Sequence, residues 1–201
     1  MKALHEYIIE LKNPLNDTFK TESGVELYAH KEFSVDRLSN RIAKVVSTPL
    51  LHNTPIEVGY EVMIEPTILY KQIFQKEKQG YTNLIDRDQM HFNVTPNMIV
   101  LYRKDENDTW KGYLKNVMLE PIEETEKPIK SNFLYIPESN QKKYKKERAK
   151  VLYGNQILEE QGAKNGDEVI INPMGGVNFW MDGKEYWWVR NTEVLGVVEK
   201  N

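Results

Sequence analysis

The chain has 201 residues, of which 40% are hydrophobic and 28% charged, and its formal net charge is −3. These values are ordinary for a globular protein of one large or two small domains, and they exclude the strong basic bias typical of nucleic-acid-binding proteins. The absence of cysteine excludes disulfides and favours a reducing compartment. The first residues lack a signal-peptide pattern and no run approaches the ~18 apolar residues of a membrane helix, so we expect a cytoplasmic protein.

The first predicted strand is Tyr7–Leu11, and a long polar stretch follows it over residues 12–40. This stretch contains a small apolar island, Val25-Glu26-Leu27-Tyr28. Connections of this length are usually functional or disordered. Apolar residues inside a polar loop are unfavourable in water, so the island indicates a segment that folds onto a partner.

A strand over Ile42–Val46 precedes the segment GYEVMIEP, which begins at Gly59. Tyr60, Val62 and Ile64 alternate with polar or outward positions, which is typical of a strand with one buried face. Gly59 suits a turn with positive φ. After this strand, Leu69, Tyr70, Ile73 and Phe74 recur at a spacing of three to four, which predicts a short helix inside an insertion over residues 67–95.

The second half shows the same kinds of element. Its polar stretch covers residues 124–147 and contains the island Phe133-Leu134-Tyr135-Ile136-Pro137, followed by a basic run (142–146) that we interpret as a solvated loop. The segment GDEVIINP begins at Gly166 and is expected to bury Val169 and Ile171. The remaining predicted strands are Met98–Arg103, Trp110–Leu114, Val117–Leu119, Val151–Tyr153, Tyr186–Arg190 and Val194–Val198.

The two halves repeat one another at a nearly constant spacing. Gly166 follows Gly59 by 107 positions, and both open the pattern Gly-x-Glu-Val-x-Ile-x-Pro. Other blocks keep the same order, with Ala43–Val46 opposite Ala149–Leu152 and Glu6–Glu10 opposite Asn116–Glu120. We therefore predict two diverged copies, residues 1–115 and 116–201, in which residues 67–95 are an insertion without a counterpart of similar length.

The blocks of the second copy resemble the GroES-type co-chaperonin family. The segments AKNGDEVII (163–171) and EYWWVRNTEVLGVVE (185–199) are similar to a central strand and the closing segment of that family, at a fitting separation. The loop ending in Leu134-Tyr135-Ile136-Pro137 and the strand from Ala149 resemble the parts that precede them. The first copy shows the same order more weakly, so the resemblance covers most of the chain outside residues 67–95.

The resemblance implies an all-β fold of two tandem small Greek-key β-barrels, with the short helical insertion in the first. It implies a non-enzymatic co-chaperonin that caps a GroEL-type chaperonin ring, forms a ring-shaped homo-oligomer and lets client proteins fold in a chamber, while the partner uses ATP. The chaperonin-binding residues carried over are Val25, Glu26 and Leu27 in one loop and Leu134, Tyr135 and Ile136 in the other. A bacterial or phage source fits this arrangement.

The sequence departs from the family pattern at both islands. Glu26 occupies the centre of the first tripeptide and Tyr28 stands where the family has proline, whereas the second loop keeps Pro137 but lacks the preceding glycine. The second loop is therefore expected to bind better. No cofactor is implied, and His5, His30, His52 and His91 show no metal-ligand spacing.

Several alternatives remain open at this stage. The islands could be strands packed on their own barrels, and the basic run could contact nucleic acid. The sides of Tyr186-Trp187-Trp188 alternate, which favours one side in the core and one in a subunit interface over a sugar or base site. A phage structural or assembly protein built from the same barrels, without chaperonin binding, is the alternative function.

Overall fold

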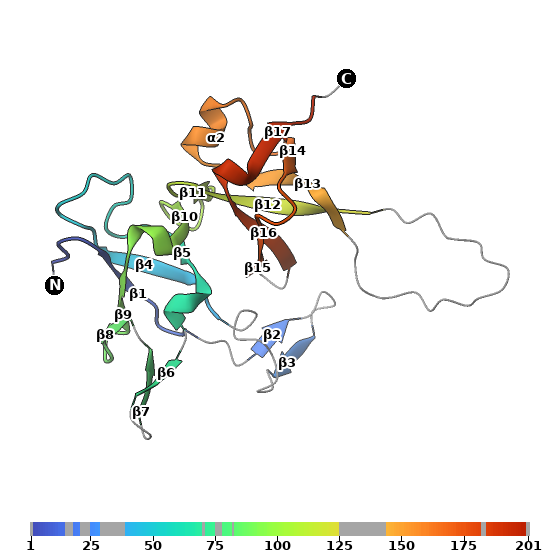
Figure 1. The fold of residues 1–201 in the computed structure, drawn as a ribbon. Coiled ribbons are helices and arrows are strands. Elements are labelled where there is room, and N and C mark those ends of the chain that lie inside the picture. The colour runs from blue at the N-terminus through green and yellow to red at the C-terminus, as the bar shows by residue number, and fades with distance from the viewer. Residues whose placement is uncertain are drawn as a thin grey trace, which may run out of the picture.

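The computed structural model describes residues 2–14, 18–20, 25–28, 39–69, 71–74, 78–81, 83–124, 144–181 and 184–199. The described chain is mostly β, with two large antiparallel sheets and one short α-helix among the described residues (Figure 1). The predicted all-β class is therefore confirmed. None of the described helices has the length and apolar character needed to cross a membrane.

The first sheet has the strand order β11-β10-β5-β4-β1-β9-β8. Its core buries Tyr7 and Ile9 of β1, Val45 of β4, and Val62 and Ile64 of β5. The buried face of β5 is the one predicted from its alternation. The strands are β1 Tyr7–Glu10, β4 Ile42–Ser47, β5 Glu61–Ile64, β8 Leu84–Asp86, β9 His91–Val94, β10 Ile99–Arg103 and β11 Lys111–Gly112, and the 3-10 helices are η1 Pro66–Leu69 and η3 Pro96–Met98.

The second sheet has the strand order β15-β16-β12-β13-β14-β17. Its own core includes Val117, Val151, Val169 and Ile171, so the predicted inward face of β14 is confirmed. The chain leaves β14, forms the β15–β16 hairpin beyond β12, and returns as β17 beside β14. The elements are β12 Asn116–Glu123, β13 Tyr144–Tyr153, α2 Gln156–Glu160, β14 Glu168–Ile171, β15 Val177–Met181, β16 Lys184–Arg190, η4 Asn191–Glu193 and β17 Val194–Val197.

The order β15-β16-β12-β13-β14-β17 matches β8-β9-β1-β4-β5-β10 strand for strand. The registers match as well: the shared pairs are Ala43↔Val62 with Ala149↔Val169, Lys44↔Glu61 with Lys150↔Glu168, and Ile9↔Val45 with Leu119↔Val151. β1 and β12 carry a register shift at the same place, before Ile9 and before Leu119.

The turns before β5 and β14 are also the same. Gly59 and Gly166 have φ values of 93° and 90°, as their position in the sequence predicts. Each glycine N–H donates to the preceding strand, from Gly59 to the Val45 carbonyl at 2.8 Å and from Gly166 to the Val151 carbonyl at 2.7 Å. A side chain at either glycine would be strained, because L residues rarely adopt this region.

The predicted helix in the insertion is wrong. Lys71–Phe74 forms strand β6, which pairs with β7 (Lys78–Tyr81) as a separate two-stranded sheet. The preceding residues form η1, in which Ile68 and Leu69 are buried in the first core. The spacing of three to four arose because Leu69 and Ile73 belong to two successive elements that each contribute apolar residues.

A third apolar cluster joins the two sheets. Met63 and Leu101 of the first sheet are buried against Met118 and Phe179 of the second, with Trp110 between them. The Arg41 guanidinium lies 4.0 Å from the centre of the Phe179 ring, and the Arg103 guanidinium lies 4.4 Å from that of Trp110. These contacts bury side chains that would otherwise stand on the outer faces of both sheets.

Polar contacts reinforce this junction. The Asn116 side-chain amide donates to the Ile99 carbonyl at 2.7 Å, and its oxygen accepts from the Trp188 indole N–H at 2.9 Å and from Arg190 at 2.8 Å. The Tyr113 hydroxyl, just before β12, lies 2.7 Å from the Tyr7 hydroxyl in the first core. A hydrogen-bond network of this kind favours one relative placement of its elements.

Candidate functional site

The candidate site consists of two long connections, one from each sheet, which lie between corresponding strands. One runs from β1 to β4 and the other from β12 to β13. In both cases the flanking strands pair with each other, so the two ends of each connection are held side by side. A loop with fixed ends and a polar composition is a common location for binding residues.

The first connection contains a small hairpin of its own. β2 (Thr18–Lys20) pairs with β3 (Glu26–Tyr28), which sets Leu27 opposite Phe19 and Glu26 opposite Lys20. The hairpin is a separate two-stranded sheet and does not extend the large first sheet. The island is thus a strand, as the alternative expected, but β3 pairs with β2 and not with the strands of the first sheet.

The predicted site residues Val25, Glu26 and Leu27 therefore follow one another along the start of one strand. Val25 is 53% exposed, so its apolar side chain is accessible. Leu134, Tyr135 and Ile136, predicted for the second loop, lie outside the described residues.

The base of the second loop is described in detail. β12 reaches Glu123, which pairs with Tyr144 at the start of β13, and the Tyr144 ring packs edge-on against Trp187 at 6.2 Å. The predicted solvated loop thus ends earlier than expected: Tyr144–Arg148 is the first half of β13. This half of the strand could not be predicted from the sequence, because both of its faces are polar and largely exposed and show no alternation.

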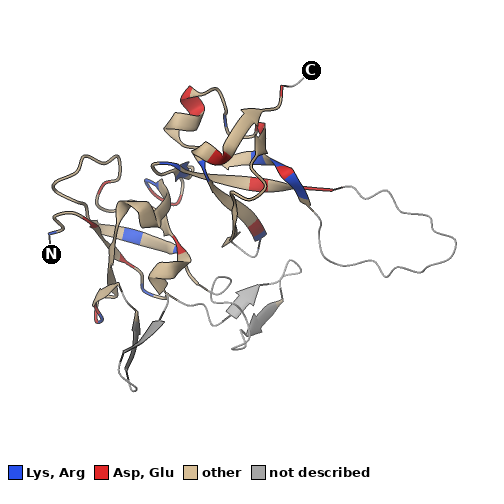
Figure 2. Cartoon of the chain, in the orientation of Figure 1, with Lys and Arg blue, Asp and Glu red and all other residues tan. Residues whose placement is uncertain are grey.

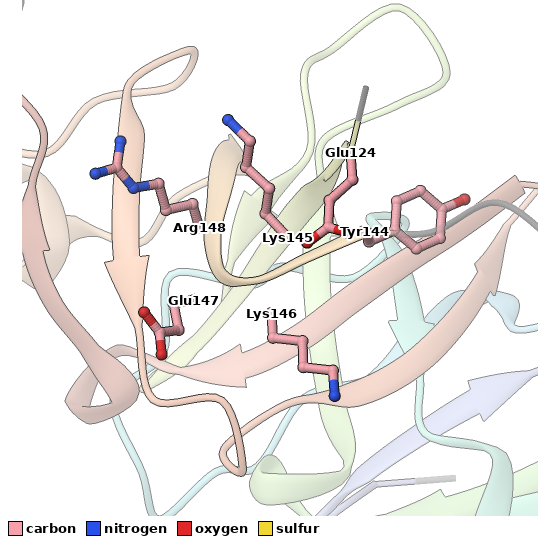
Figure 3. A pocket seen from close by; sticks show the side chains of 6 residues that line it. All are labelled: Glu124, Tyr144, Lys145, Lys146, Glu147 and Arg148. Carbon is pink, nitrogen blue, oxygen red and sulfur yellow. The ribbon is translucent and has the colours of Figure 1, made fainter. Parts of the chain in front are cut away.

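A hollow of about 550 Å³ lies at this base. Its lining residues are Glu124, Tyr144, Lys145, Lys146, Glu147 and Arg148. Figure 3 shows Lys145 and Lys146 extending to opposite sides of β13, as alternating strand residues do. Arg148 pairs with Glu168 of β14 at 3.2 Å, so part of this charge is compensated locally.

The described surface does not favour a nucleic-acid site. Figure 2 shows basic and acidic residues intermixed over both sheets, including the β13 end of the second sheet. Among the described residues, no group of three His, Asp or Glu side chains could hold a metal ion. The perturbed groups are mainly tyrosines: burial, full for Tyr7 and partial for Tyr81 and Tyr102, raises their pKa.

The residues that place the two sheets relative to each other were not predicted from the sequence. Trp110, Met118 and Phe179 are examples, although the alternation of Tyr186-Trp187-Trp188 predicted one side in the core and the other in a subunit interface. Trp187 does pack on the second core, whereas Tyr186 and Trp188 pack on the cluster between the two sheets of the same chain and not, as predicted, between subunits.

The fold is that of a β protein with two antiparallel sheets, each of which has one long connection between a corresponding pair of strands. Residues 109–198 match the family "Chaperonin 10 Kd subunit". The Co-chaperonin GroES of Rhodothermus marinus is 33% identical over 73 residues, which cover 33% of this chain and 71% of that protein. The Co-chaperonin GroES of Desulfosudis oleivorans is 29% identical over 116 residues, 55% of this chain and all of that protein. The chain belongs to the chaperonin 10 (GroES) family.

Proposed function

We propose that this protein is a co-chaperonin that caps a GroEL-type chaperonin ring through its two loops. The protein itself performs no chemistry and takes no cofactor: the partner uses ATP, and client proteins fold in the closed chamber in the cytoplasm. The observation that carries the proposal is the family match over residues 109–198, which includes the second loop and the strands on both sides of it.

The proposal includes two GroES-like copies, residues 1–115 and 116–201. The equal strand order and the equal registers of the two sheets support it. The Desulfosudis relative supports it as well, because its full length corresponds to only 55% of this chain.

The docking residues would be Val25, Glu26 and Leu27 in the first loop and Leu134, Tyr135 and Ile136 in the second. A single loop binds weakly, because ordering it costs free energy. Several loops on one ring-shaped oligomer raise the avidity by roughly 10²–10⁴. Weak single contacts that add up in this way allow release when the chaperonin changes state.

The second loop would be the stronger binder of the two. Glu26 places a charge at the centre of the first tripeptide, and burying a carboxylate in an apolar groove is costly unless it is paired. Leu134 and Ile136 carry no such cost. The exposed Val25 remains available as an apolar contact of the first loop.

The test mixes the protein with a GroEL-type ring and ATP and measures complex formation by size-exclusion chromatography. We expect a stable complex with the native chain and a loss of about tenfold or more in affinity for Leu134→Ser with Ile136→Ser. The matched control is Leu50→Ser with Val58→Ser, two exposed apolar residues outside the loops. The proposal fails if no complex forms, and the loop assignment fails if the control pair weakens binding as much as the loop pair.

A further inference from the structure

The segment before β1 and the connection after β4 lie side by side in the first sheet (Figure 1). The Ala3 and Leu4 carbonyls accept from the Leu50 and Leu51 N–H groups, at 3.2 and 3.1 Å. Each of these contacts joins positions that differ by 47 along the chain (50 − 3 and 51 − 4). The two segments therefore run in the same direction, with a constant offset between the residues that face each other.

Two histidines lie at the same level of these two segments. His5 and His52 also differ by 47 positions (52 − 5), and their ring centres are 6.1 Å apart with an angle of 53° between the ring planes. The Tyr7 and Thr54 hydroxyls, which form a hydrogen bond with each other, repeat the same offset two residues further along. Contacts before and after the histidines therefore hold the two rings beside each other.

Both imidazole rings are available to a ligand. His5 and His52 are exposed, and within the described part of the chain neither ring forms a hydrogen bond or an ion pair. The neighbouring Glu6 carboxylate accepts from the Asn93 side-chain amide and is already engaged. A neutral imidazole keeps one nitrogen as an acceptor, which makes histidine the commonest metal ligand of proteins. The two rings thus form a pair of nitrogen donors at the surface.

The spacing of the two rings suits one metal ion between them. Zinc binds an imidazole nitrogen at about 2.0–2.1 Å, which puts the centres of two rings on one ion about 5–6 Å apart, depending on the angle between the bonds. The observed 6.1 Å is close to this range, and exposed side chains change rotamer readily. Imidazole favours zinc, nickel and copper ions, whereas magnesium and calcium ions favour oxygen ligands.

We propose that His5 and His52 form a surface site for a divalent transition-metal ion of the zinc, nickel and copper class. Water fills the other positions on the ion, since no third His, Asp or Glu of the described ranges joins the pair. The bound ion links the segment before β1 to the connection after β4. This inference goes beyond the proposed function, which needs no metal, and neither depends on the other.

The second sheet joins its corresponding segments without such a site. Lys115 stands in the place of His5, because Ile9 and Leu119, four positions further on, have equivalent partners. A lysine ammonium has no lone pair to offer a metal ion. Instead, the Asn155 side-chain amide donates directly to the Leu114 carbonyl at 2.8 Å. The site is therefore a property of the first sheet alone.

The first experiment titrates the full chain with zinc chloride near neutral pH and follows the heat by isothermal titration calorimetry. We expect one ion per chain, and a loss of about tenfold or more in affinity for His5→Gln and for His52→Gln. The double variant should lose little more than either single variant, because both rings hold the same ion. A native chain that binds no zinc, or a double variant that binds it as the native chain does, overturns the inference.

The matched control is Leu4→Gln with Leu51→Gln. These exposed leucines directly precede the two histidines, so the control changes the same two segments and leaves both rings in place. We expect the control to keep the zinc affinity of the native chain. Circular dichroism verifies that all variants are folded. A control that loses as much affinity as the double histidine variant would show that the segments, and not the two rings, determine binding.

The second experiment measures thermal unfolding with and without zinc. An ion that binds the folded chain more tightly than the unfolded one raises the unfolding temperature by mass action. Folding brings His5 and His52 together, so we expect zinc to raise the unfolding temperature of the native chain and of the leucine control. The double histidine variant should not respond, and magnesium should have no effect on any of the three. An equal rise for the native chain and the double histidine variant would place the ion elsewhere and contradict the inference.

Discussion

The two sheets are built alike at their centres and differ at their edges. β4 and β5 repeat β13 and β14 in register, in the glycine turn and in the buried residues. At the edge, however, β10 is covered by β11 and by the second sheet, whereas β17 is the last strand of its sheet among the described residues. The comparison shows that equivalent strands can be buried or exposed, depending on which other elements pack against them.

The junction itself gives the largest expected effect. Trp110 is 6% exposed between the sheets and stacks with Arg103. Trp110→Ala leaves a large cavity there, and we expect a loss of about 3–5 kcal/mol in the free energy of unfolding. Urea unfolding followed by circular dichroism measures this loss. A loss below about 1 kcal/mol would show that the two sheets hold together without this cluster.

The next prediction compares equivalent positions with different surroundings. Met63 and Ile170 occupy the same place in β5 and β14, but they are 1% and 38% exposed. We expect Met63→Ala to cost about 2–5 kcal/mol. Ile170→Ala removes contacts that are only partly formed in the free chain, and we expect about 1 kcal/mol or less. Urea unfolding at a low protein concentration, where chains are separate, provides both values, and equal losses would contradict the difference between the edges.

Local patterns could be predicted wherever one face of a strand decides its burial. Val62, Ile64, Val169 and Ile171 share the faces that their alternation predicts to be inward, and all four are buried in the two cores. Met63 was assigned to the outer face, and it is buried because a sheet formed far along the chain packs on that face. The alternation of residues within one strand carries no information about which distant element packs on its outer face.

The insertion and the candidate site show the same limit. The β6–β7 hairpin was read as a helix because apolar residues from η1 and β6 fall at helical spacing by coincidence. The first loop was located correctly between its strands, but its own pairing of β2 with β3 was not foreseen. The docking role of both islands stays a prediction.

A smaller change in stability tests directly whether the central strands of the two sheets are alike. Gly59 and Gly166 share positive φ and have open space around a Cβ position, so only backbone strain opposes a side chain. We expect Gly59→Ala and Gly166→Ala to cost about 1–2 kcal/mol each, and nearly the same amount. Thermal unfolding of the two variants side by side tests this equality. Losses that differ by more than about 1 kcal/mol would mean that the two turns contribute differently to the stability of their sheets.

The smallest effect concerns a residue that only the first core contains. Tyr7 donates to or accepts from Thr54 and Tyr113, while its counterpart in the second core is Val117, which cannot ionise. Tyr7→Phe removes one hydroxyl from this group, and we expect a loss of about 1 kcal/mol at neutral pH.

The pH dependence of the same variant has a definite sign. Burial raises the pKa of Tyr7 above its ordinary value of 10.0, so the folded state retains a proton that the unfolded state releases. The stability that Tyr7 contributes is therefore fully present below about pH 10 and is lost as the pH rises through the folded pKa. Urea midpoints measured from pH 8 to 11 should fall less steeply above pH 10 for Tyr7→Phe than for the native chain. Parallel curves would show that the alkaline loss of stability comes from other groups, of which the half-buried Tyr102 is the next to test.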